Sequence, residues 1–308
     1  MAIIVAETLV FLPSKTEEII SERAVSLSPQ ASLSIQGFHA VHLNQQGQKE
    51  IIEADEAEFF KKLGYAILRK VKARIYAKGD DAIRIQGIEG KYYMETKDLE
   101  LFKDVNVISE SQGYQLKTDY LRYEERNNLI WSYDKLWLAG PNPEKPSLTL
   151  RGKGFKADTK TEEFEVLEDV HCQKFDEKAD GIEIDSAKAR AFLGKHEILF
   201  MENVVVKQKD MNIFTDNFWI TYNDQNQAID KAKAFNTVKI IQGDRIATCE
   251  NAFLLNREQK MVLRGHPKVT QGNDVVEGKI IIFFTAQNKI LFDEAIGEVE
   301  AKRAKEMN

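Results

Sequence analysis

Four aspartates recur at similar places along the chain and are the first residues whose spacing could support chemistry. They are Asp55, Asp119, Asp158 and Asp216. Carboxylates that come together can hold a metal ion or act as general acid and base in hydrolysis. Each aspartate closes a short apolar phrase, as in LKTD and IFTD, and polar residues on the outer side of strand ends give the same pattern. We therefore predict that these aspartates are outward-facing structural residues.

The other side chains capable of chemistry show no catalytic or metal-ligating spacing. They are His39, His42, His171, His196 and His266, the cysteines Cys172 and Cys249, and the tryptophans Trp131, Trp137 and Trp219. The tryptophans could stack on sugars, but aromatic residues commonly fill β-surfaces, so we favour packing. We expect the cysteines to be buried as small apolar residues. Since no phosphate-binding GxxxxGK[ST] loop occurs either, we predict no catalytic residue, no metal and no cofactor, and thus no enzyme.

Composition indicates a folded protein with a sizeable core. The 308 residues are 43% hydrophobic and 30% charged, with a formal net charge of −6. This balance gives no basic stripe, so nucleic acid is not expected as a partner. No apolar run is long enough for a membrane-spanning helix. The opening MAIIVAETLVFL contains Glu7 and lacks a basic flank, so we expect neither a complete signal peptide nor an anchor there, and a native anchoring segment upstream.

Internal repetition organises the whole chain. LELFKDVNVIS at Leu99–Ser109 returns as EILFMENVVVKQ at Glu197–Gln208. Looser versions place the last apolar residue before a polar turn at intervals of 28 to 35 residues. These positions are Leu68, Phe102, Tyr133, Leu167, Phe200, Phe235, Leu263 and Phe292. A second phrase, with the form of LKTD or IFTD, alternates with the first without a break.

Alternating apolar and polar residues within both phrases predict β-strands with one buried face. We expect each repeat of about 32 residues to hold at least two short strands, separated by turn signals such as Lys103-Asp104 and Asn127-Asn128. A parallel β-helix fits such a stack, but the density of hairpin-like turns favours antiparallel strands in a bent sheet. The rhythm continues across the charged connector KFDEKADG at residues 174–181. Two domains meeting there would continue one another's sheet.

The repeated phrases resemble a known family. From about Glu7 to Lys174 the chain resembles the periplasmic domain of LptC, through IIEADEAEFF, IQGIEGKYYMETKDLELFKDVNVISESQGYQLKTDYLRYEERNNLIWS and LTLRGKGFKADTKTEEFEVLEDV. From about Asp180 onward it resembles LptA, or the OstA domain, through HEILFMENVVVKQKDMNIFTDNFWITY and LLNREQKMVLRGHPKVTQGNDVVEGKIIIFFTAQNKILFDEA.

This resemblance implies two stacked antiparallel β-jellyroll (β-taco) domains, residues 1–176 and 177–308, that form one continuous open groove. It implies a periplasmic bridge that shields the acyl chains of lipopolysaccharide between inner and outer membrane. The implied partners are an inner-membrane ATP-driven transporter at the N-terminal sheet edge and an outer-membrane translocon at the C-terminal edge. Unpaired edges also suggest end-to-end self-association. The N-terminal membrane helix expected of LptC is absent from the sequence, so anchoring would depend on a further segment.

Alternation and the family's inward face together predict which residues line the groove. They are Val105, Val107, Tyr114, Leu116, Thr118, Val204, Val206, Met211, Ile213, Thr215, Val276, Ile280 and Ile282. A register error of one residue would reverse the faces. Two other classes fit the repeat: a structural scaffold with a filled core, which binds no lipid, and a β-helical enzyme that cleaves polysaccharide.

Overall fold

The computed structural model describes residues 31–44, 47–77, 81–175, 181–223, 228–284, 289–293 and 296–298. The opening segment, and with it the expectation about a leader or anchor, lies outside these residues. In the part of the chain that is described, no helix is long and apolar enough to cross a membrane. The described elements are β-strands and single-turn 3-10 helices, which confirms the predicted all-β class.

The chain divides into two compact units. The first unit comprises residues 1–144 and 154–162, and the second comprises residues 145–153 and 163–308. Strand β8 (Leu148–Asp158) therefore contributes to both. These units do not meet at residues 176/177, and the two β-jellyroll domains expected on either side of that boundary stay a prediction.

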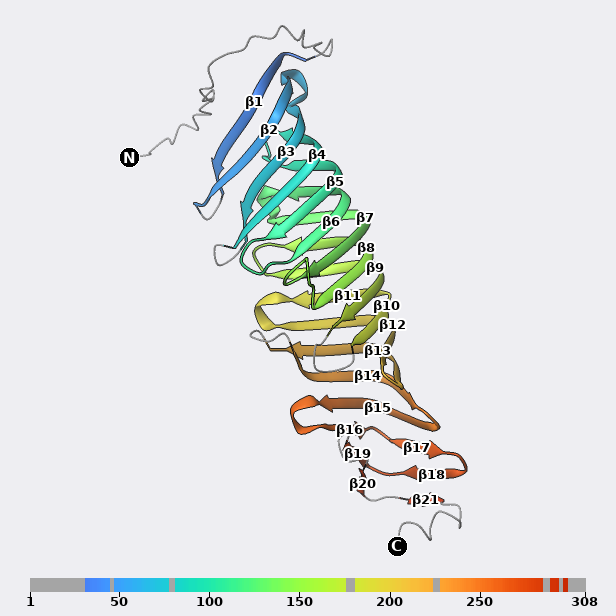
Figure 1. Ribbon diagram of the computed structural model, residues 1–308. Helices are drawn as coiled ribbons and strands as arrows, with labels where there is room; N and C mark the ends of the chain where they lie inside the picture. The colour runs from blue at the N-terminus through green and yellow to red at the C-terminus, as the bar shows by residue number, and fades with distance from the viewer. Residues whose placement is uncertain are drawn as a thin grey trace, which may run out of the picture. The chain divides into compact units, whose positions relative to one another are not determined.

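The strands of the first unit form an antiparallel meander in which each strand pairs with the next (Figure 1). They are β1 (Leu33–Leu43), β2 (Lys49–Phe60), β3 (Tyr65–Tyr76), β4 (Ala82–Tyr93), β5 (Leu99–Ser109), β6 (Gln115–Glu124) and β7 (Leu129–Gly140). The 3-10 turns η1 (Lys61–Leu63) and η3 (Glu125–Asn127) join β2 to β3 and β6 to β7. Gly64 and Asn128 end these turns in the left-handed conformation, which glycine and asparagine adopt most readily.

The second unit, described by itself, is also antiparallel and has shorter strands at its C-terminal end. It contains β9 (Glu163–Lys174), β10 (Ile182–Ser186), β11 (Lys188–Phe192), β12 (Glu197–Gln208), β13 (Met211–Tyr222), β14 (Ile229–Gln242) and β15 (Arg245–Leu255). These are followed by β16 (Lys260–Arg264), β17 (Lys268–Gln271), β18 (Asp274–Glu277), β19 (Ile280–Phe284), β20 (Lys289–Asp293) and β21 (Ile296–Glu298). The turns η4 (Leu193–Lys195) and η5 (Asn256–Glu258) repeat the geometry of η1.

The polar pairs of the first repeated phrase bend strands in the middle. Lys103-Asp104, Glu202-Asn203 and Asn236-Thr237 all have positive φ, between 50° and 65°, and lie inside β5, β12 and β14. The pairing register shifts at the same places, between Phe102 and Val105 in β5 for example. The expectation that Lys103-Asp104 separates two short strands is therefore wrong: it is a β-bulge that bends one long strand. Asn127-Asn128, by contrast, lies at a true turn.

The left-handed residues make the bend sensitive to side-chain shape. Each pair contains an Asn or Asp, which tolerate positive φ better than other non-glycine residues. We expect Asp104→Val to lower the free energy of unfolding by about 1–2 kcal/mol, because a β-branched side chain clashes with the backbone there. Asp104→Gly is the matched control and should cause no such loss. Urea unfolding of both variants tests this prediction. An equal loss of unfolding free energy in both variants would show that the left-handed backbone at Asp104 is not the cause of the loss.

Candidate functional site

The predicted groove residues of the first unit lie opposite one another in the sheet. Val105 of β5 pairs with Thr118 of β6, and Val107 pairs with Leu116. Directly opposed residues project from the same face. The two phrases of the repeat thus place their apolar side chains together, as the alternation indicates.

The second unit repeats this arrangement. Val204 of β12 pairs with Thr215 of β13, and Val206 pairs with Ile213. Met211, at the start of β13, pairs with Gln208. The residues predicted from the two phrases therefore share a face in both units.

Pairing from strand to strand extends these contacts into a ladder on one side of the bend, called wall A here. In the first unit wall A consists of Ile52, Ala73, Ile85, Val107, Leu116 and Leu138. In the second unit wall A consists of Cys172, Ile184, Val206, Ile213, Ile240, Ala247, Val269 and Val276. All members are apolar, so each unit carries an unbroken apolar row that crosses its strands.

A second ladder, wall B, lies on the other side of the bend. In the first unit it consists of Phe59, Ala66, Tyr92, Leu99, Tyr123 and Ile130. In the second unit it consists of Val166, Ala189, Phe200, Phe218, Ala234, Ala252, Leu263 and Ile281. Every one of these side chains is at most 5% exposed. Because both ladders lie on one face of the sheet and the sheet bends between them, the two walls of each unit are inclined toward the same interior.

The predicted lining residues differ in burial. Val105, Leu116, Thr118, Val204, Val206, Ile213 and Thr215 are buried. Val107, Tyr114, Met211, Val276, Ile280 and Ile282 are partly exposed. In β19 the fully buried residue is Ile281, which pairs with Leu263, so Ile280 and Ile282 face the other way from wall B. A groove-lining role for the thirteen residues stays a prediction.

The two threonines of the predicted set have a local structural role at the bend. The Thr215 hydroxyl donates to the backbone carbonyl of Phe235 at 2.9 Å, beside the bulge in β14. Thr118 Oγ1 lies 3.4 Å from the Ser132 hydroxyl. A bulge leaves backbone groups without ladder partners, and a hydroxyl that reaches them lowers the cost of burying them.

Wall B was missed at the sequence level. In the second unit, the signal that could have found it is the apolar residue two positions before a polar pair, such as Phe200 or Ala234, which are both fully buried. Phe102, which we used to mark the repeat, instead lies on the outer face and contacts Tyr120 with ring centroids 5.4 Å apart. The missed residues include Phe200, Leu99, Leu263 and Ile281, which are among the largest fully buried side chains of the described residues.

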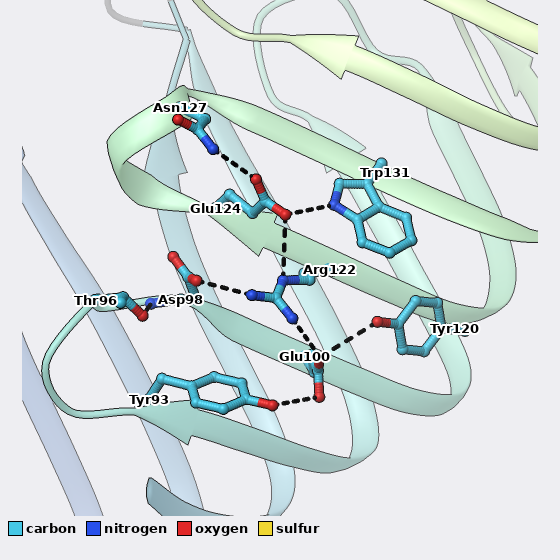
Figure 2. A network of polar contacts seen from close by, with 9 residues as sticks. All are labelled: Tyr93, Thr96, Asp98, Glu100, Tyr120, Arg122, Glu124, Asn127 and Trp131. Atoms are coloured by element: carbon cyan, nitrogen blue, oxygen red, sulfur yellow. Dashed lines mark hydrogen bonds and ion pairs between the residues drawn. The ribbon is translucent and has the colours of Figure 1, made fainter. Parts of the chain in front are cut away.

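The outer face of the first unit carries a polar network centred on Arg122 (Figure 2). Its guanidinium donates to Glu100 at 2.8 Å and to Asp98 at 3.0 Å, and lies 3.3 Å from Glu124. Tyr93 and Tyr120 donate to Glu100, and Trp131 donates to Glu124. The network ties β4, β5, β6 and β7 together on the side away from walls A and B.

Hydrogen bonds hold one carboxylate of this network in its charged form. Donation by Asn127 and Trp131, together with the charge of Arg122, lowers the pKa of Glu124 below its usual 4.5. A carboxyl whose folded-state pKa is lowered stabilises the fold above its unfolded pKa, and that stabilisation is lost as the pH falls through the lowered value. The network is therefore intact at neutral pH.

Three of the four recurring aspartates lie at exposed positions, as predicted, and Asp158 is half-buried. Asp55, Asp119 and Asp216 are exposed and lie within strands at the bend rather than near strand ends, whereas Asp158 ends β8 and accepts hydrogen bonds from the backbone of Lys160 and Thr161. Asp55 forms an ion pair with Lys70 at 2.9 Å. Within the described ranges, no group of three or more His, Cys, Asp or Glu side chains could hold a metal ion.

The cysteines and tryptophans take structural positions. Cys172 and Cys249 are buried, as predicted, and burial raises the pKa of Cys172 to about 12 and that of Cys249 to about 11. Neither thiol is therefore a ready nucleophile at neutral pH. Trp131 packs edge-on against Tyr120, and Lys117 lies over the ring of Trp137.

Comparison with known families gives two successive matches. Residues 1–174 match the family described as lipopolysaccharide-assembly, LptC-related. The chain belongs to the LptC-related family. Residues 183–289 of this LptC-related protein match a second family, described as LptA/(LptD N-terminal domain) LPS transport protein. The resemblance stated from the repeated phrases is thereby confirmed for both halves.

The chain was also compared with curated protein sequences and with solved structures. No curated protein sequence matches the LptC-related chain. Among solved structures, it is similar to LptH of Pseudomonas aeruginosa, the LptA homologous periplasmic component of that organism's lipopolysaccharide transport device. The identity is 12% and the TM-score 0.36, over 39% of this chain and 94% of that chain.

Proposed function

We propose that the chain is a periplasmic component of lipopolysaccharide transport, in which residues 1–176 act as an LptC-like domain and residues 177–308 as an LptA-like domain. Each unit would carry acyl chains between walls A and B. The observation that supports this best is the unbroken apolar ladder of each wall. Lipid would pass from the first domain to the second.

The physical requirement for such a carrier is large. Each methylene exposed to water costs about 0.8 kcal/mol, so an acyl chain of about a dozen carbons costs on the order of 10 kcal/mol. A wall with similar side chains at every strand lowers this cost equally along its length. On such a surface the lipid can move from strand to strand without meeting a position of much higher affinity.

Sheet edges support the proposed partners. In the described pairings β1 bonds to β2, and Leu33, Val41 and Leu43 of β1 are exposed by 41%, 40% and 68%. An edge strand with exposed apolar side chains is suited to strand addition. We propose that the ATP-driven transporter of the inner membrane docks here, and that the outer-membrane translocon docks at the C-terminal edge, where self-association could also occur.

Edge pairing predicts a specific loss of binding. Val41→Pro should disrupt addition of a strand to β1, because proline removes a backbone donor, and should weaken binding of the transporter's periplasmic domain at least tenfold. Val41→Ala is the matched control, because it truncates the same side chain and keeps the backbone donor. Isothermal titration measures both variants, and unchanged affinity for Val41→Pro would rule out pairing through β1.

The carrier role is tested by photo-crosslinking with purified lipopolysaccharide. Photoreactive side chains replace Leu116 in the first unit and Ile213 in the second, and Asn212 provides the control on the opposite face of β13. We expect lipid adducts at Leu116 and Ile213 and at least tenfold fewer at Asn212. Adducts at none of the three sites in the folded protein would favour a scaffold.

A scaffold with a filled core is the second candidate. The complete burial of Phe200, Ile213 and Leu263 favours it, because side chains that are already fully buried must move apart before an acyl chain can contact them. The two candidates therefore differ in whether the walls open.

A further inference from the structure

Glu50 occupies an inward position that apolar residues otherwise fill. It lies in β2 two residues before Ile52 and four before Ala54, so the three side chains share one face. Ile52 belongs to wall A, and Glu50 itself is fully buried. A buried carboxylate is costly unless hydrogen bonds compensate it.

The partner of Glu50 comes from the opposite wall. The Tyr123 hydroxyl donates to the Glu50 carboxylate, at 3.1 Å from Oε1 and 3.3 Å from Oε2. Tyr123 lies in β6 and belongs to wall B. Strands β3, β4 and β5 separate β2 from β6 in the order of pairing, so the contact crosses the interior rather than following the sheet.

Two further polar side chains lie beside Glu50. His42 Nε2 of β1 lies 3.1 Å from Glu50 Oε2, and Asn44 donates to Glu50 Oε1 at 3.3 Å. Besides Glu50, the charges that act on Tyr123 are those of Glu125 and Asp98. The charges that act on Glu125 include those of His42 and Arg126. Burial and the charge of Glu50 raise the pKa of Tyr123, so its hydroxyl remains a donor at neutral pH.

Separating the walls costs more free energy at the Glu50–Tyr123 contact than at the apolar ladders. An acyl chain inserted between walls A and B replaces one apolar contact with another, so the ladders lose little. The Tyr123–Glu50 hydrogen bond finds no substitute in a hydrocarbon chain, and breaking it leaves a buried carboxylate short of a donor. Opening at this point is therefore opposed by a specific polar interaction.

We propose that Glu50 and Tyr123 form a latch that holds the walls of the first unit together and limits the admission of acyl chains there. The inference rests on the proposed carrier function and concerns its regulation. Lipid supplied from the N-terminal side must release the latch before it advances, and the latch closes the interior again after the lipid has passed.

The test compares two tyrosines of the same strand. Tyr123→Phe removes the latch hydroxyl and keeps the ring, whereas Tyr120→Phe removes a hydroxyl bonded to Glu100 on the outer face. With purified lipopolysaccharide, we expect Tyr123→Phe to increase the rate of adduct formation at Leu116 about tenfold, given the strength of a hydrogen bond to a charged group. Adduct formation at Ile213 and in Tyr120→Phe should match the wild type.

Hydrogen–deuterium exchange without lipid gives an independent readout. We expect faster exchange in β1 and β2 for Tyr123→Phe, an intermediate effect for Glu50→Gln, and wild-type exchange in these strands for Tyr120→Phe. Wild-type adduct rates at Leu116 and wild-type exchange in Tyr123→Phe would overturn the latch while leaving the carrier function intact. Faster exchange combined with no adducts in any variant would instead overturn the carrier function and retain a purely structural contact between the walls.

Discussion

Phe200→Ala is expected to lower the free energy of unfolding of the second unit by about 3–5 kcal/mol. Phe200 is fully buried in wall B between Ala189 and Phe218. The substitution leaves a cavity, and the neighbouring Ala189 side chain is too small to fill it. Urea unfolding followed by intrinsic fluorescence of Trp219, which lies in β13 of the same unit, measures the loss.

Phe214→Ala is the matched control for this prediction. Phe214 lies in the same unit but is 39% exposed, so its truncation should cost less than about 1 kcal/mol. Equal losses for the two variants would mean that wall B is not the main source of stability in this unit. A loss below about 1 kcal/mol for Phe200→Ala would mean that the walls are loosely packed in solution.

Arg122→Met is expected to lower the free energy of unfolding of the first unit by about 2–3 kcal/mol at pH 7. The substitution leaves Asp98, Glu100 and Glu124 close together without their shared cation. Loss of one member of a buried ion pair costs about 3–5 kcal/mol, and we reduce this figure because the Arg122 side chain is 27% exposed. Thermal or urea unfolding at pH 7 tests the magnitude.

The same variant has a predicted pH dependence. Arg122 contributes to the lowered pKa of Glu124. The stabilisation that Arg122 gives the fold is therefore present above pH 4.5 and declines as the carboxylates become protonated. The difference between wild type and Arg122→Met should therefore shrink between pH 7 and pH 3. Arg69→Met, whose side chain is 63% exposed beside Glu56, should cost less than about 0.5 kcal/mol at either pH. An equal difference at both pH values would exclude an electrostatic origin.

Local sequence pattern was sufficient for the β-strand class and for part of wall A. Alternation fixes which residues share a face, and the repeated phrases fall on neighbouring strands, so Val206 and Ile213 could be predicted to lie together. The family resemblance followed from the same phrases. These features depend on residues a few positions apart or on the period of the repeat.

The bend and the latch could not be predicted from local pattern. Lys103-Asp104 is as suitable for a turn as for a bulge, because left-handed residues occur in both; only pairing with β6 distinguishes them. The role of Glu50 depends on Tyr123, 73 positions away, and no short-range spacing reveals such a contact. Ile281 was missed because IIIFF offers apolar residues on both faces of its strand.

The mid-strand bulges have a consequence for how the protein can change in length. Because each hairpin carries its own bend, its own share of both walls and its own turn, it is a self-contained module. Neighbouring strands are spaced by about 4.8 Å, so one added hairpin would lengthen a unit's walls by about 10 Å. Duplication or loss of a repeat would thus adjust the distance a unit spans in fixed increments, leaving the cross-section unchanged, and the number of repeats would serve as a molecular ruler.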